Sequence, residues 1–179
     1  DDTGSRGLGD VYKRQDPNPV IFMEHKLIYK IKDNVKLNDI PKESSMLGKA
    51  NLIKEGNDIT IVAYSNMVNV AKEAIAADEL QNCSIELIDL QTVSPIDYDT
   101  IKNSLKKTKR LLVCQEAPSN SSVGTTVISK IVESELFHEL EVAPKLVSGL
   151  HSPMPSAKHL ELNVIPQAED ITNAVKSML

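Results

Sequence analysis

The amino-acid sequence predicts a three-layer α/β/α fold, in which a mostly parallel five-stranded sheet carries one antiparallel strand. Short apolar runs alternate along the chain with stretches whose apolar residues recur at helical spacing. This alternation is typical of a parallel sheet covered by helices on both faces. Aromatic residues make up only 3% of the chain and Trp is absent, so the core must be built from aliphatic side chains, as is usual in buried α/β sheets.

The first two strands of this domain are expected on either side of a turn. Residues 49–54 alternate weakly between apolar and polar side chains, and residues 59–63 form a continuous apolar run. The segment Glu55-Gly-Asn-Asp58 between them has the composition of a turn. A hairpin between the two runs is the simplest arrangement, and it would supply the antiparallel strand.

Strands and helices then alternate up to the end of the chain. Three further strands are expected at residues 85–90, 111–115 and 145–148. Helical spacing of apolar residues predicts helices around residues 67–75, 101–105, 123–132 and 170–179. Ser65 or Asn66 is expected to cap the first helix, and the turn Ser94-Pro-Ile-Asp97 should open the second.

The first 47 residues do not follow this pattern. Residues 1–15 are polar and have no usable periodicity, and we interpret them as non-native or disordered sequence. Residues 19–24 form an apolar run that predicts a buried strand, and such a strand needs neighbouring strands for its backbone hydrogen bonds. We therefore expect residues 16–47 to be the end of one domain plus a connector, and residues 48–179 to be a complete second domain.

The composition argues against several classes of function. The formal net charge of −5 does not suit a surface for nucleic acid or for an anionic membrane. No apolar stretch approaches the ~20 residues that span a bilayer. Two cysteines, Cys83 and Cys114, are too few for a disulfide scaffold, so we expect free thiols in a reducing compartment.

The ends of the predicted strands are the places to search for chemistry, because ligands of open α/β sheets bind beyond the carboxyl ends of the strands. These positions are residues 64–65, 89–91, 115–116 and 149–151. They lack the acid cluster of a phospho-acceptor receiver and the glycine-rich turn of a dinucleotide-binding fold. They also lack the Gly-x-Ser-x-Gly elbow of a nucleophilic hydrolase.

A few titratable residues remain as candidates. Asp89 and Glu116 are acids at ends of strands that we expect to be adjacent, where they can do acid–base work or simply accept hydrogen bonds from loop amides. His25 and His151 each follow a predicted strand, which favours a structural or interface role over catalysis. No histidine has a partner at metal-ligand spacing, so the residues alone predict no complete catalytic set.

Several segments, taken in order, carry a resemblance to one family. They are residues 16–29, 48–50, 55–63 and 88–97, then Gln115-Glu-Ala117, Gly149 with Pro153-Met-Pro155, and Ile165-Pro166. Together they resemble the beta subunit of thiamine-diphosphate-dependent 2-oxoacid dehydrogenases of the pyruvate, branched-chain and acetoin types. The resemblance implies the end of a pyrimidine-binding domain at residues 16–47 and a transketolase C-terminal domain at residues 48–179.

The resemblance also implies an activity and its partners. The intact enzyme would decarboxylate a 2-oxoacid oxidatively and pass the acyl group to lipoamide, using thiamine diphosphate and Mg²⁺. Its partners would be an alpha subunit, a second beta subunit and a lipoyl acyltransferase, in the cytoplasm of a bacterium or in the mitochondrial matrix of a eukaryote. The glutamate that activates the cofactor and the motif that holds its diphosphate lie outside the matched segments. We therefore expect no catalytic, cofactor-binding or metal-binding residue in this chain, and no activity from it alone.

In such a family the C-terminal domain builds subunit interfaces and docks the acyltransferase. The candidate interface residues are His25, Glu116, Glu139, Glu141, His151 and Leu179. Two positions depart from the family pattern: Gln91 stands where relatives commonly carry Arg, and His151 replaces an Asp. Gln91 weakens one alternative, a transketolase or deoxyxylulose-phosphate synthase, because an amide does not hold a substrate phosphate as a guanidinium does. A stand-alone, non-catalytic interaction module is the other alternative.

Overall fold

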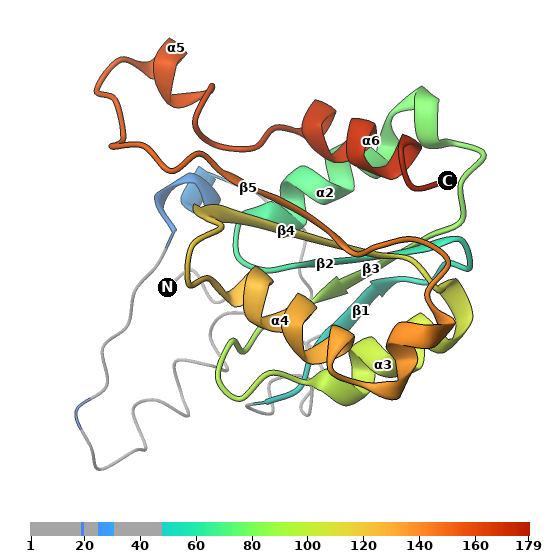
Figure 1. Ribbon diagram of the computed structural model, residues 1–179. Coiled ribbons are helices and arrows are strands. Elements are labelled where there is room, and N and C mark those ends of the chain that lie inside the picture. Colours follow the sequence, from blue (N-terminus) through green and yellow to red (C-terminus); the bar gives the residue numbers. More distant parts are fainter. Residues whose placement is uncertain (1–18, 20–24, 31–47) are drawn as a thin grey trace, which may run out of the picture. The chain divides into compact units, whose positions relative to one another are not determined.

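The computed structural model describes residue 19, residues 25–30 and residues 48–179 (Figure 1). The chain divides into two units, residues 1–47 and residues 48–179. In the first unit the described residues include one short 3-10 helix, η1 (Lys26–Lys30). The segment at residues 1–15 lies outside the described residues, as do residues 20–24 of the strand expected at residues 19–24 and most of the connector that follows.

Residues 48–179 are organised around a five-stranded mixed sheet. Its strands are β1 (Asn51–Lys54), β2 (Ile59–Ala63), β3 (Ile85–Asp89), β4 (Leu111–Pro118) and β5 (Lys145–Gly149). The order across the sheet is β1-β3-β2-β4-β5. Strand β1 runs antiparallel to β3, and the pairs β3–β2, β2–β4 and β4–β5 are parallel. The predicted sheet, mostly parallel with one antiparallel strand, is confirmed.

The hairpin predicted between the first two strands is wrong, because β3 lies between them. Strand β1 pairs with β3, and Asn51 stands opposite Asp89. The turn after β1 crosses the start of β3: the Gly56 amide donates to Glu86 Oε2 at 3.1 Å, and the amides of Asn57 and Asp58 both donate to one backbone carbonyl at 2.8 Å. A turn bound in this way leads the chain across β3 into β2, so the two consecutive strands do not become neighbours.

Helices cover both faces of the sheet, as the three-layer prediction requires. Figure 1 shows α2 (Met67–Ala76) and α6 (Ala168–Lys176) on one face, and α3 (Tyr98–Thr108) and α4 (Val123–Val132) on the other. Shorter elements are η3 (Asp78–Leu80), η4 (Glu135–Glu139) and α5 (Lys158–Glu161). Within the described residues, none of these helices has the length and apolar character needed to cross a membrane.

Strand β2 shows how the sequence divides its side chains between the two faces. All five of its residues are buried, and successive side chains of a strand point to opposite faces. Ile61 packs in the cluster with α2 and α6, and Val62 packs in the cluster with α3 and α4. Thr60 is also buried, and its hydroxyl lies 2.5 Å from Ser104 Oγ and 2.6 Å from Thr108 Oγ1, both on α3. The one polar residue of this strand is thus fully hydrogen-bonded, as a buried hydroxyl requires.

The predicted N-cap interaction is present in α3 and absent in α2. Asp97 caps α3 by accepting a hydrogen bond from the Thr100 amide, as the turn before this helix predicted. Asn66 occupies the N-cap of α2, but its side chain makes no capping bond there. Its amide group donates to Glu116 Oε1 at 3.4 Å instead. Asn66, one of the two residues predicted to cap this helix, thus contacts the carboxyl edge of the sheet with its side chain.

Candidate functional site

The carboxyl edge of the parallel strands is the candidate site, because strained backbone gathers there. Ser65 follows β2, Gln91 follows β3 and Ser121 follows β4, and their φ angles are 55°, 51° and 49°. Residues other than glycine rarely adopt this left-handed conformation, which costs roughly 1–3 kcal/mol and occurs preferentially at functional sites. Three such residues after three parallel strands mark this edge as a place where loop geometry is constrained.

A polar cluster from β4 and the β2–α2 loop occupies the edge. The Tyr64 hydroxyl donates to Gln115 Oε1 at 3.5 Å, and the Asn66 amide donates to Glu116 Oε1 at 3.4 Å. Burial, and next the charge of Glu116, raise the pKa of Tyr64. The phenol therefore remains protonated at neutral pH and acts as a hydrogen-bond donor. The cluster presents hydroxyl and amide groups around a single carboxylate, which suits hydrogen bonding to another surface.

The side chain of Gln115 binds the N-terminal turn of α4. It is fully buried, and its Oε1 accepts a hydrogen bond from the Gly124 amide at 2.7 Å. Its Nε2 donates to the carbonyls of Ala117 at 2.9 Å and Pro118 at 3.0 Å. The amides at a helix N-terminus are a common binding site for phosphate. Here one of them is already bound by a side chain, and a Cβ at Gly124 would lie only 2.7 Å from Gln115 Oε1.

The predicted pair of carboxylates at adjacent strand ends is not formed. Asp89 lies at the end of β3 and Glu116 in β4, and β2 separates these two strands. Asp89 Oδ1 accepts a hydrogen bond from the Gln91 amide at 3.1 Å, and burial raises the pKa of the Asp89 carboxyl. Asp89 thus stabilises the tight loop after β3, in agreement with the structural alternative for these acids.

The two acids expected to contact a partner have different surroundings. Glu141 forms an ion pair with Arg110, whose Nη2 lies 2.6 Å from Glu141 Oε2. Glu139 is exposed on η4 and lines a groove of about 350 Å³ between α3 and η4. Both carboxylates are exposed, and Glu141 is the one of the two that already forms an ion pair.

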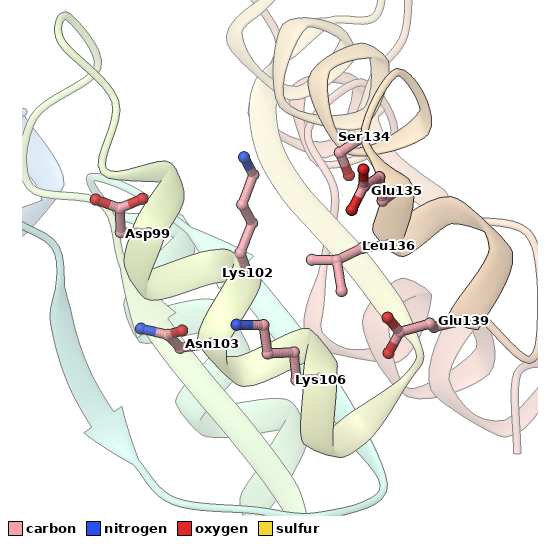
Figure 2. Close-up of a pocket in the computed structure, with 8 residues that line it drawn as sticks. All are labelled: Asp99, Lys102, Asn103, Lys106, Ser134, Glu135, Leu136 and Glu139. Carbon is pink, nitrogen blue, oxygen red and sulfur yellow. The ribbon is translucent and has the colours of Figure 1, made fainter.

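This groove has walls of opposite charge (Figure 2). Its lining residues are Asp99, Lys102, Asn103 and Lys106 from α3, and Ser134, Glu135, Leu136 and Glu139 from η4 and its N-cap. Leu136 points between the two walls in Figure 2. Among the described residues, no ion pair within 4.0 Å joins the lysines of one wall to the glutamates of the other. An open groove of this kind can accept charged side chains of another protein, and charges at a rim steer association more than they add affinity.

Two of the remaining interface candidates lie on the surface of residues 48–179. His151 is exposed in the loop after β5, and Leu179 at the C-terminus keeps half of its side chain exposed. His25 is half-buried and belongs to the separate unit of residues 1–47. Within residues 48–179 the structure does not bring the other five candidates together at one place, and Glu116 is the one that lies in the polar cluster at the carboxyl edge.

A hollow beside β5, and a group of exposed apolar side chains in the segment that follows, were not found from the sequence. A hollow of about 480 Å³ lies between β5 and residues 162–167, and its walls include Leu146, Val147 and Val164. The chain between β5 and α6 also exposes large apolar side chains, which are Leu150, Met154, Leu160 and Leu162. Grouped exposed apolar residues mark interaction surfaces in soluble proteins. The sequence feature that could have revealed this surface is the presence of several leucines between β5 and α6, in a segment without strand or helix periodicity.

The described residues do not fit a magnesium-bound diphosphate. No group of three or more His, Cys, Asp or Glu residues in the described parts of the chain is placed to hold a metal ion. At the carboxyl edge a diphosphate would approach the carboxylates of Asp89 and Glu116. The Gly124 amide, which would otherwise attract an anion, is already bound to Gln115. The arrangement can make hydrogen bonds to a protein surface.

Comparison with known proteins relates the chain to enzymes. Residues 48–171 match the family model described as "Transketolase, C-terminal domain". The chain is 39% identical over 164 residues to the pyruvate dehydrogenase E1 component subunit beta of Rickettsia bellii, an alignment that covers 92% of this chain and 49% of the relative. It is 36% identical over 163 residues to the mitochondrial subunit of the same name from Pisum sativum, covering 90% of this chain and 45% of that protein.

The chain thus spans about half the length of the curated relatives that it matches. Among solved structures it resembles a split-gene transketolase in an inactive β4 tetramer, with a TM-score of 0.62 and 25% identity. That similarity covers 75% of this chain and 43% of the other. Because the family model matches more than half of the chain, the chain belongs to the transketolase C-terminal domain family.

Proposed function

We propose that this chain is the C-terminal part of the beta subunit of a 2-oxoacid dehydrogenase of the pyruvate or acetoin type. In the intact enzyme it would act with an alpha subunit and a second beta subunit. The reaction would be oxidative decarboxylation of a 2-oxoacid, followed by transfer of the acyl group to lipoamide. The observation that carries this proposal is the 39% identity to a pyruvate dehydrogenase E1 beta subunit over 92% of the chain.

Thiamine diphosphate with Mg²⁺ would supply the chemistry of the intact enzyme, while protein groups orient the reactants. The described residues offer no metal-ligand group, and the carboxyl edge is lined by carboxylates. We therefore assign this domain a role in subunit assembly and partner docking, and no step of the reaction.

The carboxyl edge of the sheet is the first proposed contact surface. Tyr64 and Asn66 are held by Gln115 and Glu116 in fixed positions, so few of their rotamers would be lost on binding. Glu116 would contribute the charge at this surface. His25 and His151 are proposed contacts of the same kind, each following a strand predicted from the sequence.

The acidic wall of the α3–η4 groove, which η4 forms, is proposed to dock the lipoyl acyltransferase. Glu139 is exposed there, whereas Glu141 is paired with Arg110. Because an exposed carboxylate attracts a basic partner over a distance of about one Debye length, we expect Glu139 to affect mainly the association rate. Leu179 would add an apolar contact at the C-terminus.

The test begins with titration calorimetry of this chain with thiamine diphosphate and Mg²⁺, for which we expect no binding. The beta subunit extended upstream of residue 16 is then co-expressed with the alpha subunit, and pyruvate and acetoin are compared as substrates with an artificial electron acceptor. The extended assembly should turn over one of these two substrates. In the cell, we expect the enzyme in the cytoplasm of a bacterium or in the mitochondrial matrix of a eukaryote. Tight cofactor binding by this chain alone would contradict the assigned role.

A transketolase is the second candidate, since the solved structure that supports the fold is a split-gene transketolase at 25% identity. The same extended assembly distinguishes the two, because a transketolase would move a two-carbon unit between sugar phosphates and would not decarboxylate pyruvate. If the gene encodes no further domain upstream of residue 16, the remaining candidate is an interaction module without catalysis.

A further inference from the structure

The chain enters the domain through a short segment that is bound by the loop after β3. The Gly48 amide donates to Thr92 Oγ1 at 3.1 Å, and the Ala50 amide donates to Asp97 Oδ2 at 3.1 Å. The Lys49 ammonium lies 3.9 Å from the same carboxylate oxygen. Two consecutive anchor points thus hold the three residues that precede β1.

Asp97 is placed to hold this segment because the start of α3 fixes its carboxylate. Asp97 is only 5% exposed, and it accepts hydrogen bonds from the Thr100 amide at 3.2 Å and from the Thr100 hydroxyl at 2.8 Å. A buried carboxylate is stable when several donors surround it. The Ala50 amide is one of these donors, so the start of the domain is tied to the cap of a helix.

The backbone conformation and the missing side chain of Gly48 permit its contact with the loop after β3. Its φ of +82° lies in the left-handed region that favours glycine, and a Cβ at this position would lie 3.1 Å from Pro95 Cγ. The close approach to the loop therefore depends on the absence of a side chain, and it brings the Gly48 amide within reach of Thr92.

Strand pairing alone would leave this segment loose. The β1–β3 ladder begins at Asn51, opposite Asp89, and β1 is a four-residue strand at the edge of the sheet. Ends of short edge strands open readily because few hydrogen bonds hold them. The bonds to Thr92 and Asp97 extend the ordered backbone three residues beyond the ladder, up to the boundary between the two units at residues 47 and 48.

We infer that Thr92 and Asp97 are positioning residues that form an anchor for residues 48–50, so that the preceding connector starts from a fixed point of this domain. The anchor lies wholly within residues 48–179. It does not depend on which reaction the intact protein performs, and it would serve an interaction module as well as an enzyme subunit.

The test uses variants that remove one anchor point at a time. Thr92→Val removes the acceptor of the Gly48 amide and keeps the shape of the side chain. Asp97→Ala removes the acceptor of the Ala50 amide together with the cap of α3. Thr100→Val is the matched control, because it removes one donor to Asp97 and leaves both anchor bonds in place.

Amide hydrogen exchange of the full chain measures the anchor directly. One hydrogen bond of typical net strength corresponds to about a fivefold change in an opening equilibrium. We expect exchange of the Gly48 amide to rise about fivefold in Thr92→Val, and exchange of the Ala50 amide to rise at least as much in Asp97→Ala. Neither amide should change in Thr100→Val, and the Ile61 amide of buried β2 reports any loss of global stability.

Trypsin provides an independent readout at Lys49, whose side chain is 61% exposed while its backbone lies between the two anchored amides. Cleavage after Lys49, identified by the mass of the fragment of residues 50–179, should be slow in the wild type and in Thr100→Val, and faster in both anchor variants. The inference is overturned if the Gly48 and Ala50 amides exchange without protection in the wild type, or if Thr92→Val leaves exchange and cleavage unchanged.

Discussion

Replacing Gly56 by Ala tests the feature that sets the order of the strands. Gly56 lies in the turn that crosses the start of β3, and a Cβ there would lie 2.1 Å from the carbonyl carbon of Ile85 and 2.3 Å from the amide nitrogen of Glu86. Both neighbours are backbone atoms of a buried strand, so they cannot rotate away. Non-bonded carbon atoms rest at about 3.5–4.0 Å, and the turn must therefore move by more than about 1 Å.

That displacement breaks the bonds between the turn and β3. They are the Gly56 amide to Glu86 Oε2 at 3.1 Å, and the Asn57 and Asp58 amides to the Ser84 carbonyl at 2.8 Å. Each contributes about 1 kcal/mol, and the bond to the charged carboxylate contributes about 1.5–3 kcal/mol. We expect Gly56→Ala to lower the free energy of unfolding by about 3–5 kcal/mol, a large part of the roughly 5–15 kcal/mol of a typical domain.

Urea unfolding followed by far-UV circular dichroism measures this loss. With a slope of about 2 kcal/mol per molar urea, the midpoint should fall by roughly 2 M. Glu55→Ala is the control, because Glu55 is exposed in the same turn and its loss should change stability by less than about 0.5 kcal/mol. A Gly56→Ala midpoint within error of the control would refute the packing of this turn against β3.

Three further perturbations follow from buried groups. Burial alone would raise the pKa of Glu86, but hydrogen bonds led by that from Lys107 lower it, so its stabilisation is present at neutral pH and is lost as the pH falls through the lowered pKa of the folded state. The difference between the urea midpoints of the wild type and Glu86→Gln should therefore be largest at neutral pH and shrink as the pH is lowered. A thiol reagent should label Cys83 in the native state and Cys114 only after unfolding, because burial raises the pKa of the fully buried Cys114 thiol. Gln115→Leu should lower the free energy of unfolding by about 1–3 kcal/mol in thermal denaturation, since it leaves the buried Gly124 amide unpaired.

The elements themselves were predictable because each depends on a short stretch of chain. Ile61 and Val62 pack on opposite faces of the sheet, as the period of a strand requires. Asp97 caps α3 through the Thr100 amide, an interaction contained within four residues. Such patterns are visible in any window of the sequence, without knowledge of the neighbours that each element will meet.

The candidate site was only partly predictable. The carboxyl edge was identified, because parallel strands end at one side of a sheet. The sequence did not reveal that Asn66 turns away from its helix to contact Glu116, or that Gln115 reaches the Gly124 amide. Each of these bonds joins side chains whose meeting depends on how two elements pack, and no local pattern encodes that packing.

The sequence by itself determined the α/β class, the succession of strands and helices, and the resemblance to a family of enzyme subunits. The tertiary structure alone decided which strands are neighbours: β3 separates β1 from β2, and β2 separates Asp89 from Glu116. The physical reason is that periodicity arises from the geometry of consecutive residues, whereas strand order depends on contacts between segments far apart in the chain. The Gly56 turn is bound across the start of β3 by Glu86, 30 positions away in the sequence. This long-range contact places β3 between β1 and β2.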